Sequence, residues 1–146
     1  MANSEGATPL NVATERGHKE AVIALLLAKA AVNQACNDGG GPVYVAAQNG
    51  HSDVLKLLIK AGGDVNQLMK GDFSPLIMAS GNGNAECVKV LLAADANALH
   101  KTDDGSTALD LAILKKHPAV IAILQAHLAQ LDAKAEGEGE GEGEGK

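Results

Sequence analysis

Aromatic residues and cysteines are nearly absent from this chain of 146 residues, which has one Tyr, one Phe, no Trp and two Cys. A hydrophobic core must therefore be aliphatic, and the length suits one ordinary domain of ~100–200 residues. Two cysteines are too few for a disulfide scaffold, which favours a reduced, intracellular protein. No apolar run approaches the ~20 residues that span a bilayer. Because the first residues also lack the pattern of a secretory signal, we expect no membrane partner and a place in the cytoplasm or nucleus.

A basic excess is missing as well, since 12 Lys and Arg residues stand against 18 Asp and Glu residues. Five of the acids alternate with glycine in residues 136–145, and Lys146 follows them; without these six charges, 11 basic and 13 acidic residues remain. Nucleic-acid binding therefore lacks its main electrostatic driving force. The Glu-Gly run has no apolar residue, which predicts a disordered acidic tail over residues 135–146. An acidic lure for a basic partner is the alternative.

A spacing of 33 residues organises the rest of the chain. Four columns follow it: Pro9, Pro42 and Pro75; Gly17, Gly50 and Gly83; His18, His51 and His117; and Leu25, Leu58, Leu91 and Leu124. No insertion or deletion interrupts the columns. The spacing predicts four tandem units, at about residues 3–35, 36–68, 69–101 and 102–134.

Each unit carries the signals of two short helices. Thr8, Ser74 and Thr107 precede the first helix, where a hydroxyl can accept hydrogen bonds from free N–H groups, and a proline often follows. Glycine then ends the first helix in the left-handed conformation. The second helix begins one residue later, and apolar residues recur along it at helical spacing. A loop rich in Gly, Asn and Asp completes the unit.

The segments Thr8-Pro9-Leu10, Gly17-His18 and Gly62-Gly63-Asp64-Val65-Asn66 resemble the ankyrin-repeat family. The resemblance covers all four units and implies an all-α fold, the ankyrin-repeat α-solenoid. In this fold helix pairs stack into a continuous core and the loops project as hairpin-like fingers. It further implies a non-enzymatic module that binds a protein partner and needs no cofactor.

Several positions depart from the family pattern. Lys29 and Asp95 replace the glycine after the second helix, and Lys116 replaces the glycine after the first. A non-glycine residue in the left-handed conformation costs roughly 1 kcal/mol. The order Gly71-Asp72 is reversed from the usual Asp-Gly, so we expect that finger to deviate.

Residues that could carry chemistry have simpler structural explanations. His18, His51 and His117 share one position of the repeat, which indicates a role in the turn between helices and not in a reaction. His100 and His127 lack neighbours at metal-site spacing. Cys87 falls inside a second helix, where a buried, inert thiol is expected. We therefore predict no catalytic, cofactor or metal residues.

The resemblance implies that a partner binds the fingers and the exposed side of the first helices. We expect Leu68 and Phe73 to anchor it, with Tyr44 at the border, although Met69 or Phe73 could instead fold back onto neighbouring fingers. The predicted binding residues are Tyr44, Gln48, Asn49, Leu68, Met69, Lys70, Phe73, Asn82, Lys101 and Asp103. The same surface further includes Glu15, Arg16, Asn37, Asp38, Ser106 and Lys115.

The two ends of the predicted stack differ. Ile23 and Leu27 occupy positions that are usually polar in the family, which favours another covering segment, a longer repeat array or self-association. The final helix carries polar residues and is expected to cap the core. We therefore predict a monomer, with weak self-association as the alternative. The context of Asn33 and Asn66 also resembles that of ankyrin asparagines hydroxylated by a cellular dioxygenase.

Overall fold

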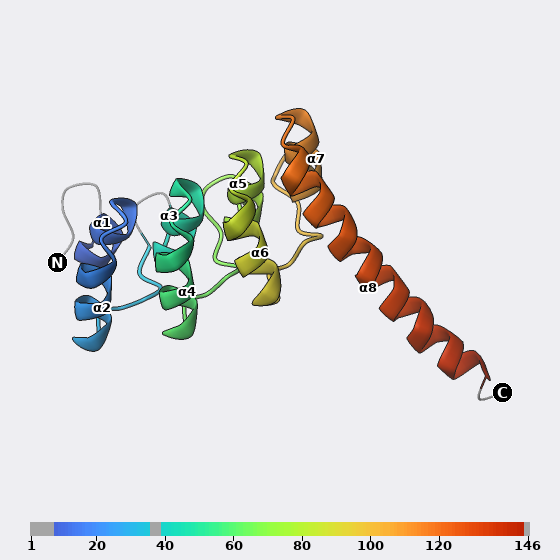
Figure 1. Cartoon of the computed structure of the whole chain (residues 1–146), viewed down its shortest axis with the longest axis horizontal. Coiled ribbons are helices and arrows are strands. Elements are labelled where there is room, and N and C mark those ends of the chain that lie inside the picture. Colours follow the sequence, from blue (N-terminus) through green and yellow to red (C-terminus); the bar gives the residue numbers. More distant parts are fainter. Residues whose placement is uncertain (1–7, 36–38, 145–146) are drawn as a thin grey trace.

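Four helix pairs stack side by side in the computed structural model of the chain (Figure 1). The structure describes residues 8–35 and 39–144, with side chains as far as residue 134. The first helices are α1 (Pro9–Glu15), α3 (Pro42–Asn49), α5 (Pro75–Gly81) and α7 (Ala108–Leu114). The second helices are α2 (Lys19–Leu27), α4 (Ser52–Lys60), α6 (Ala85–Ala93) and α8 (Pro118–Glu144). Across these two ranges the chain forms no strand, and the predicted all-α solenoid is confirmed.

Neighbouring units pack through both rows of helices. In the first row α3 lies between α1 and α5, and α5 lies between α3 and α7. In the second row α4 contacts α2 and α6, and α6 contacts α8. The hydrophobic core is mainly aliphatic, as the composition predicted, and Leu55, Leu76 and Leu91 belong to one cluster that runs from α1 to α8. Stability therefore resides in the interfaces between neighbouring units.

The predicted caps begin three of the four first helices. The hydroxyl oxygens of Thr8, Ser74 and Thr107 each accept a hydrogen bond of 3.1 Å from the backbone N–H three residues later. In α7 the Asp110 carboxylate also accepts a bond from the Thr107 N–H, which completes a capping box. Unit two has Gly41 at this position and no side-chain cap.

The turns after the helices adopt the predicted left-handed conformation. Gly17, Gly50 and Gly83 have φ angles of 69°, 74° and 75°, and Lys116 adopts a φ of 61° at the same position in unit four. Lys29 and Asp95 also have positive φ angles, of 66° and 65°. The repeat therefore imposes its backbone even where the glycine is missing, at the strain expected for an L side chain.

The final helix is longer than the other second helices. α8 continues to Glu144 and leads away from the stack (Figure 1). Its backbone differs from the disordered tail predicted to begin at residue 135. The physical reason is that adding residues to an existing helix needs no new nucleus, so even Glu-Gly pairs can continue it. Glycine still costs about 1 kcal/mol per residue inside a helix. The division into a repeat domain and a disordered acidic tail over residues 135–146 therefore stays a prediction.

The α7 end of the stack is less completely capped than the sequence indicated. Ile113 is 52% exposed and Leu114 is 68% exposed. Thr14 and Ser80, which share the repeat position of Ile113, are fully buried because another first helix follows each of them. The polar final helix therefore shields the second row, while the last first helix keeps an apolar open side.

Candidate partner-binding surface

The histidine column joins consecutive units. The ring Nε2 of His51 lies 2.9 Å from the Glu15 carbonyl oxygen, and that of His117 lies 3.0 Å from the Gly81 carbonyl oxygen. Asn84 fills the same position in unit three, and its Nδ2 donates to the Ala47 carbonyl over 2.8 Å. These side chains satisfy free carbonyls at the ends of first helices. Their structural role agrees with the interpretation drawn from their spacing.

This contact also explains the glycine that precedes each histidine position. A Cβ added at Gly17 would lie 2.8 Å from the His51 ring, and one added at Gly83 would lie 2.6 Å from the His117 ring. The glycine is therefore required for two reasons: it accepts a positive φ, and its lack of a side chain leaves room for the next unit.

Asparagine side chains link the fingers in a second row. The Asn33 Oδ1 accepts a hydrogen bond of 2.7 Å from the Asp64 N–H, and the Asn66 Oδ1 accepts one of 2.9 Å from the Asn97 N–H. The Gln67 Nε2 also donates to the Asn33 carbonyl oxygen over 2.9 Å. Hydroxylation of Asn33 and Asn66 stays a prediction. These hydrogen bonds fix the position of each finger relative to the next before a partner binds.

The finger at residues 68–73 folds into a tight loop. The Met69 N–H donates to the Phe73 carbonyl oxygen over 2.8 Å, and Gly71 and Asp72 both have positive φ angles. The expected deviation from the usual finger is therefore present. Two bonds tie the loop to the next unit: the Asp103 N–H donates to the Gly71 carbonyl, and the His100 ring lies 2.8 Å from the Asp72 carbonyl oxygen.

The apolar side chains of this finger divide into two kinds. Phe73 is half-buried and packs against the core, and Met69 is half-buried as well. Leu68 is 38% exposed. The alternative in which one of the two side chains folds back thus describes Phe73, and Leu68 is left as the exposed apolar side chain of the loop.

Tyr44 does not border this surface, and its prediction is wrong. The side chain is 1% exposed within α3. Asn11 and Ile77 occupy the same repeat position, and both are buried as well. The third residue of a first helix is therefore buried in units one to three, which leaves Tyr44 no surface to offer a partner.

The polar residues predicted for the surface are exposed. They are Gln48, Asn49, Lys70, Asn82, Lys101 and Asp103. Asn82 also holds two units together, since its Nδ2 donates to the Gln48 carbonyl oxygen over 3.0 Å. Glu15, Arg16 and Lys115 are exposed and Ser106 is half-buried, while Asn37 and Asp38 lie outside the described residues.

A hollow of about 160 Å³ opens between two fingers beside Leu68. Asn66, Leu68, Ser74, Asn97 and His100 line it. The predicted binding surface did not include Asn97 or His100, nor Leu99, which is 64% exposed nearby in the chain. Leu99 shares the repeat position of Asn33 and Asn66, whose side chains link the fingers. A leucine in place of this asparagine was the signal in the sequence that could have drawn attention to Leu99.

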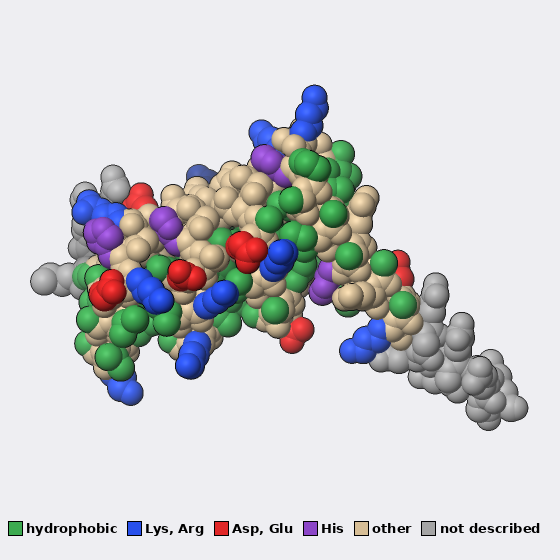
Figure 2. Space-filling model, in the orientation of Figure 1, with side chains coloured by type: hydrophobic (Ala, Val, Ile, Leu, Met, Phe, Trp, Pro, Cys, Tyr) green, Lys and Arg blue, Asp and Glu red, His purple; other side chains and the backbone are tan. Residues whose placement is uncertain are grey.

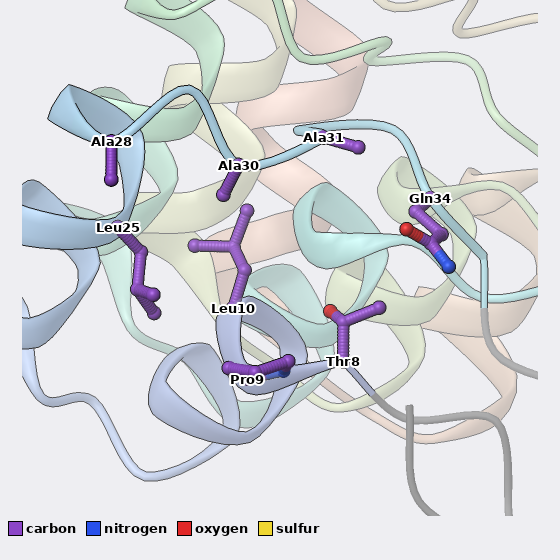
Figure 3. A pocket seen from close by; sticks show the side chains of 8 residues that line it. All are labelled: Thr8, Pro9, Leu10, Leu25, Ala28, Ala30, Ala31 and Gln34. Carbon is purple, nitrogen blue, oxygen red and sulfur yellow. The ribbon is translucent and has the colours of Figure 1, made fainter. Parts of the chain in front are cut away.

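A second hollow of about 210 Å³ lies at the α1 end of the stack (Figure 3). Leu10 and Leu25 line it together with Thr8 and Gln34. None of its eight lining residues is charged. The hollow therefore offers no acid–base pair for chemistry.

Two groups have perturbed pKa values, for structural reasons. Burial, with a smaller contribution from Glu86, raises the pKa of the Cys87 thiol to about 11, which agrees with the inert role predicted for it. Hydrogen bonds from the hydroxyl groups of Thr102 and Ser106 lower the pKa of the Asp104 carboxyl in the last finger. In the described part of the chain no three His, Cys, Asp or Glu residues gather to hold a metal ion. Nor does any helix found there have the length and apolar character needed to cross a membrane.

A comparison with protein families agrees with this architecture. The family model for ankyrin repeats (3 copies) matches residues 1–69 and again residues 44–135. The chain therefore belongs to the ankyrin-repeat family, whose members are in general protein–protein interaction modules. A search of curated proteins finds no match to the chain.

Proposed function

We propose that this ankyrin-repeat protein binds a protein partner through its fingers, with Leu68 as the apolar anchor. The observation that carries the proposal is the exposed Leu68 side chain beside the hollow between two fingers. An apolar group at the mouth of a hollow gains most when a partner removes it from water. The exposed Leu99 extends the apolar contact toward the next finger.

The surroundings of Leu68 suit a protein interface. Lys70, Lys101 and Asp103 are exposed around the anchor and supply a polar rim. The Asn66 Oδ1 accepts a hydrogen bond from the Asn97 N–H, and the His100 ring lies within hydrogen-bond distance of the Asp72 carbonyl oxygen. These contacts hold the fingers in place, so a partner loses little affinity to loop ordering. The module then acts by binding alone, without catalysis or a cofactor, and localises its partner or occludes the partner's active surface.

We also propose that binding takes place inside the cell, in the cytoplasm or nucleus. The buried free thiol of Cys87 is compatible with a reducing compartment. Microscopy of a fluorescent fusion tests this part of the proposal. Secretion of the fusion into the medium would contradict it.

The test of the binding site compares two leucines of equal exposure. Leu68 and Leu131 are both 38% exposed, but Leu131 lies on α8, away from the fingers. We expect Leu68→Asp to lose the specific partners of the native chain in quantitative affinity mass spectrometry, and Leu131→Asp to keep them. Circular dichroism must first show equal helicity for the three proteins.

Charge variants extend the same experiment. Lys70→Glu and Lys101→Glu alter the rim and should weaken recovery of the same partners less than Leu68→Asp does, because rim charges contribute little affinity. If the partners persist with Leu68→Asp, the anchor lies elsewhere and the proposed surface is wrong.

A further inference from the structure

Two junctions between units can be compared at the base of the fingers. The hollow beside Leu68 lies at the junction of units two and three. Each of its five lining residues has an equivalent 33 positions earlier, at the junction of units one and two: Asn33, Ala35, Gly41, Asp64 and Gln67. The earlier junction therefore shows what kind of group the later one can accept.

The earlier junction holds a carboxamide that belongs to the chain itself. The Nε2 of Gln67 donates to the Asn33 carbonyl oxygen over 2.9 Å. The same carboxamide lies close against Gly41, the residue before α3, because a Cβ added at Gly41 would be 2.6 Å from the Gln67 Oε1. A primary carboxamide thus fits between two fingers, with its nitrogen at the carbonyl oxygen of one finger and its oxygen beside the start of a first helix.

The later junction has a histidine in place of this glutamine, and the contact differs. The ring Nε2 of His100 lies 2.8 Å from the Asp72 carbonyl oxygen, in the loop of the finger. The Asn66 carbonyl oxygen, which is equivalent to the Asn33 oxygen, accepts no hydrogen bond from the described residues. The hollow of about 160 Å³ therefore lies where the earlier junction has the Gln67 carboxamide.

The hollow offers hydrogen-bond donors as well as this acceptor. The Ser74 hydroxyl accepts a bond from the Ile77 N–H and still has its own proton to donate. The side-chain oxygens of Asn66 and Asn97 each accept a backbone N–H, while their amide nitrogens donate no hydrogen bond within the described part of the chain. A carboxamide has an oxygen and two N–H donors, so it can satisfy both kinds of group at once.

The side chain of Ser74 sets the depth of this site. A Cβ at the equivalent Gly41 position would collide with a carboxamide placed like that of Gln67. A carboxamide at the later junction must therefore lie further out, where its oxygen meets the Ser74 hydroxyl. Ser74 is buried, so its hydroxyl lies at the floor of the hollow.

A carboxylate suits the hollow less well than a carboxamide. It would place negative charge beside the Asn66 carbonyl oxygen, which can only accept hydrogen bonds. The exposed charges around the hollow have both signs: Lys70, Lys101, Asp72 and Asp103. The face drawn in Figure 2 likewise mixes acidic with basic side chains. Local hydrogen bonds, and not a field of one sign, therefore decide which group binds here.

We propose that the hollow binds the side-chain carboxamide of a glutamine or asparagine of the protein partner. Its nitrogen donates to the Asn66 carbonyl oxygen, and its oxygen accepts from the Ser74 hydroxyl or the Asn97 amide. An apolar residue beside it in the partner then covers Leu68 and Leu99. This inference rests on the proposed function and names the chemistry that the finger surface recognises.

Selection from a display library of random peptides tests this chemistry. The full chain is the bait, and Leu68→Asp is used for counter-selection. We expect the peptides retained by the native chain alone to share a Gln or Asn beside an apolar residue. Replacement of that Gln or Asn by Glu or by Leu should weaken binding at least about tenfold, because either change leaves polar groups of the hollow unpaired.

A change in the hollow itself gives a second test. His100→Gln supplies a carboxamide from the chain, as Gln67 does at the earlier junction, and should block the carboxamide of the peptide. His100→Ala removes the same contact with Asp72 but supplies no carboxamide. After circular dichroism shows equal helicity, calorimetry should find at least about tenfold weaker peptide binding in His100→Gln than in His100→Ala. Equal affinities would overturn the inference, because only the loop contact would then matter.

The outcomes separate this inference from the proposed function. If the selected peptides depend on Leu68 but tolerate Glu or Leu in place of the carboxamide residue, the inference is wrong and the proposed surface stands. If the native chain retains no peptide that Leu68→Asp loses, Leu68 is no anchor and both proposals fall. Replacing residues of the peptide leaves the chain unchanged, so this readout does not depend on the folding of a variant of the hollow.

Discussion

The junctions inside the stack and the free end at α7 use the same repeat positions in opposite ways. Inside, a glycine leaves room for the next histidine or asparagine, as at Gly83 and His117. At the end, Lys116 stands in the glycine position and Ile113 is half exposed. The comparison teaches that a residue at this position inside the stack must fit both its own turn and a side chain of the next unit, whereas Lys116 has only its own turn to satisfy in the described residues.

Replacing a leucine by alanine should show the largest difference in stability between the interior of the stack and its α7 end. Leu91 is fully buried between units, and Leu114 is 68% exposed at the end of α7. We expect Leu91→Ala to lower the free energy of unfolding by about 3 kcal/mol through lost burial and a cavity. Leu114→Ala should change it by less than about 0.5 kcal/mol. Urea unfolding followed by circular dichroism measures both, and similar losses would break the comparison.

A glycine substitution inside the stack should have the next largest effect. Gly83→Ala introduces a strained φ and a Cβ 2.6 Å from the His117 ring, so we expect a loss of about 2 kcal/mol. Gly62→Ala is the control, because Gly62 has a φ of 94° with nothing near its Cβ position. Its loss should be about 1 kcal/mol, from backbone strain alone. Equal losses in urea unfolding would show that the ring contact contributes nothing.

The reverse substitution at the end should stabilise the protein. Lys116 has a φ of 61°, which glycine adopts without strain. Lys116→Gly should therefore raise the free energy of unfolding by about 0.5–1 kcal/mol, partly offset by the greater freedom of glycine in the unfolded chain. Thermal unfolding detects the gain as a higher midpoint. A lower midpoint would mean that Lys116 makes a favourable contact outweighing its strain.

Removal of the acidic segment should have the smallest effect. Truncation after residue 134 deletes the last part of α8, whose backbone leads away from the stack (Figure 1). We expect the free energy of unfolding to change by less than about 0.5 kcal/mol, because few interfaces between units are lost. Amide hydrogen exchange should show protection around Leu124 and little in residues 136–144. Strong protection there would refute the predicted tail.

Much of the fold follows from local rules in the sequence. The 33-residue spacing gave the helix pairs, the hydroxyl caps of Ser74 and Thr107 marked helix starts, and glycine marked the left-handed turns. These features depend on each residue's own backbone and nearest neighbours, so a pattern can reveal them. The exposed polar residues of the fingers follow for the same reason, because polar side chains at loop positions stay in water.

The apolar residues of the proposed site did not follow from the sequence alone. Tyr44 is buried, Met69 and Phe73 are half-buried, and only Leu68 of the four is exposed. Composition cannot tell which of these side chains are exposed, because their burial depends on the contacts that the next unit makes. Leu99 and His100 were missed because their importance arises from a hollow shared by two fingers.

The sequence by itself determined the repeat, the helix pairs, the aliphatic core and the family of this protein. Those properties are periodic, and a period can be read along one chain. Only the tertiary structure decided which further leucines remain in water, Leu99 in a finger and Leu114 at the α7 end. Exposure is a property of neighbours, and residues 33 positions apart become neighbours only when the units stack.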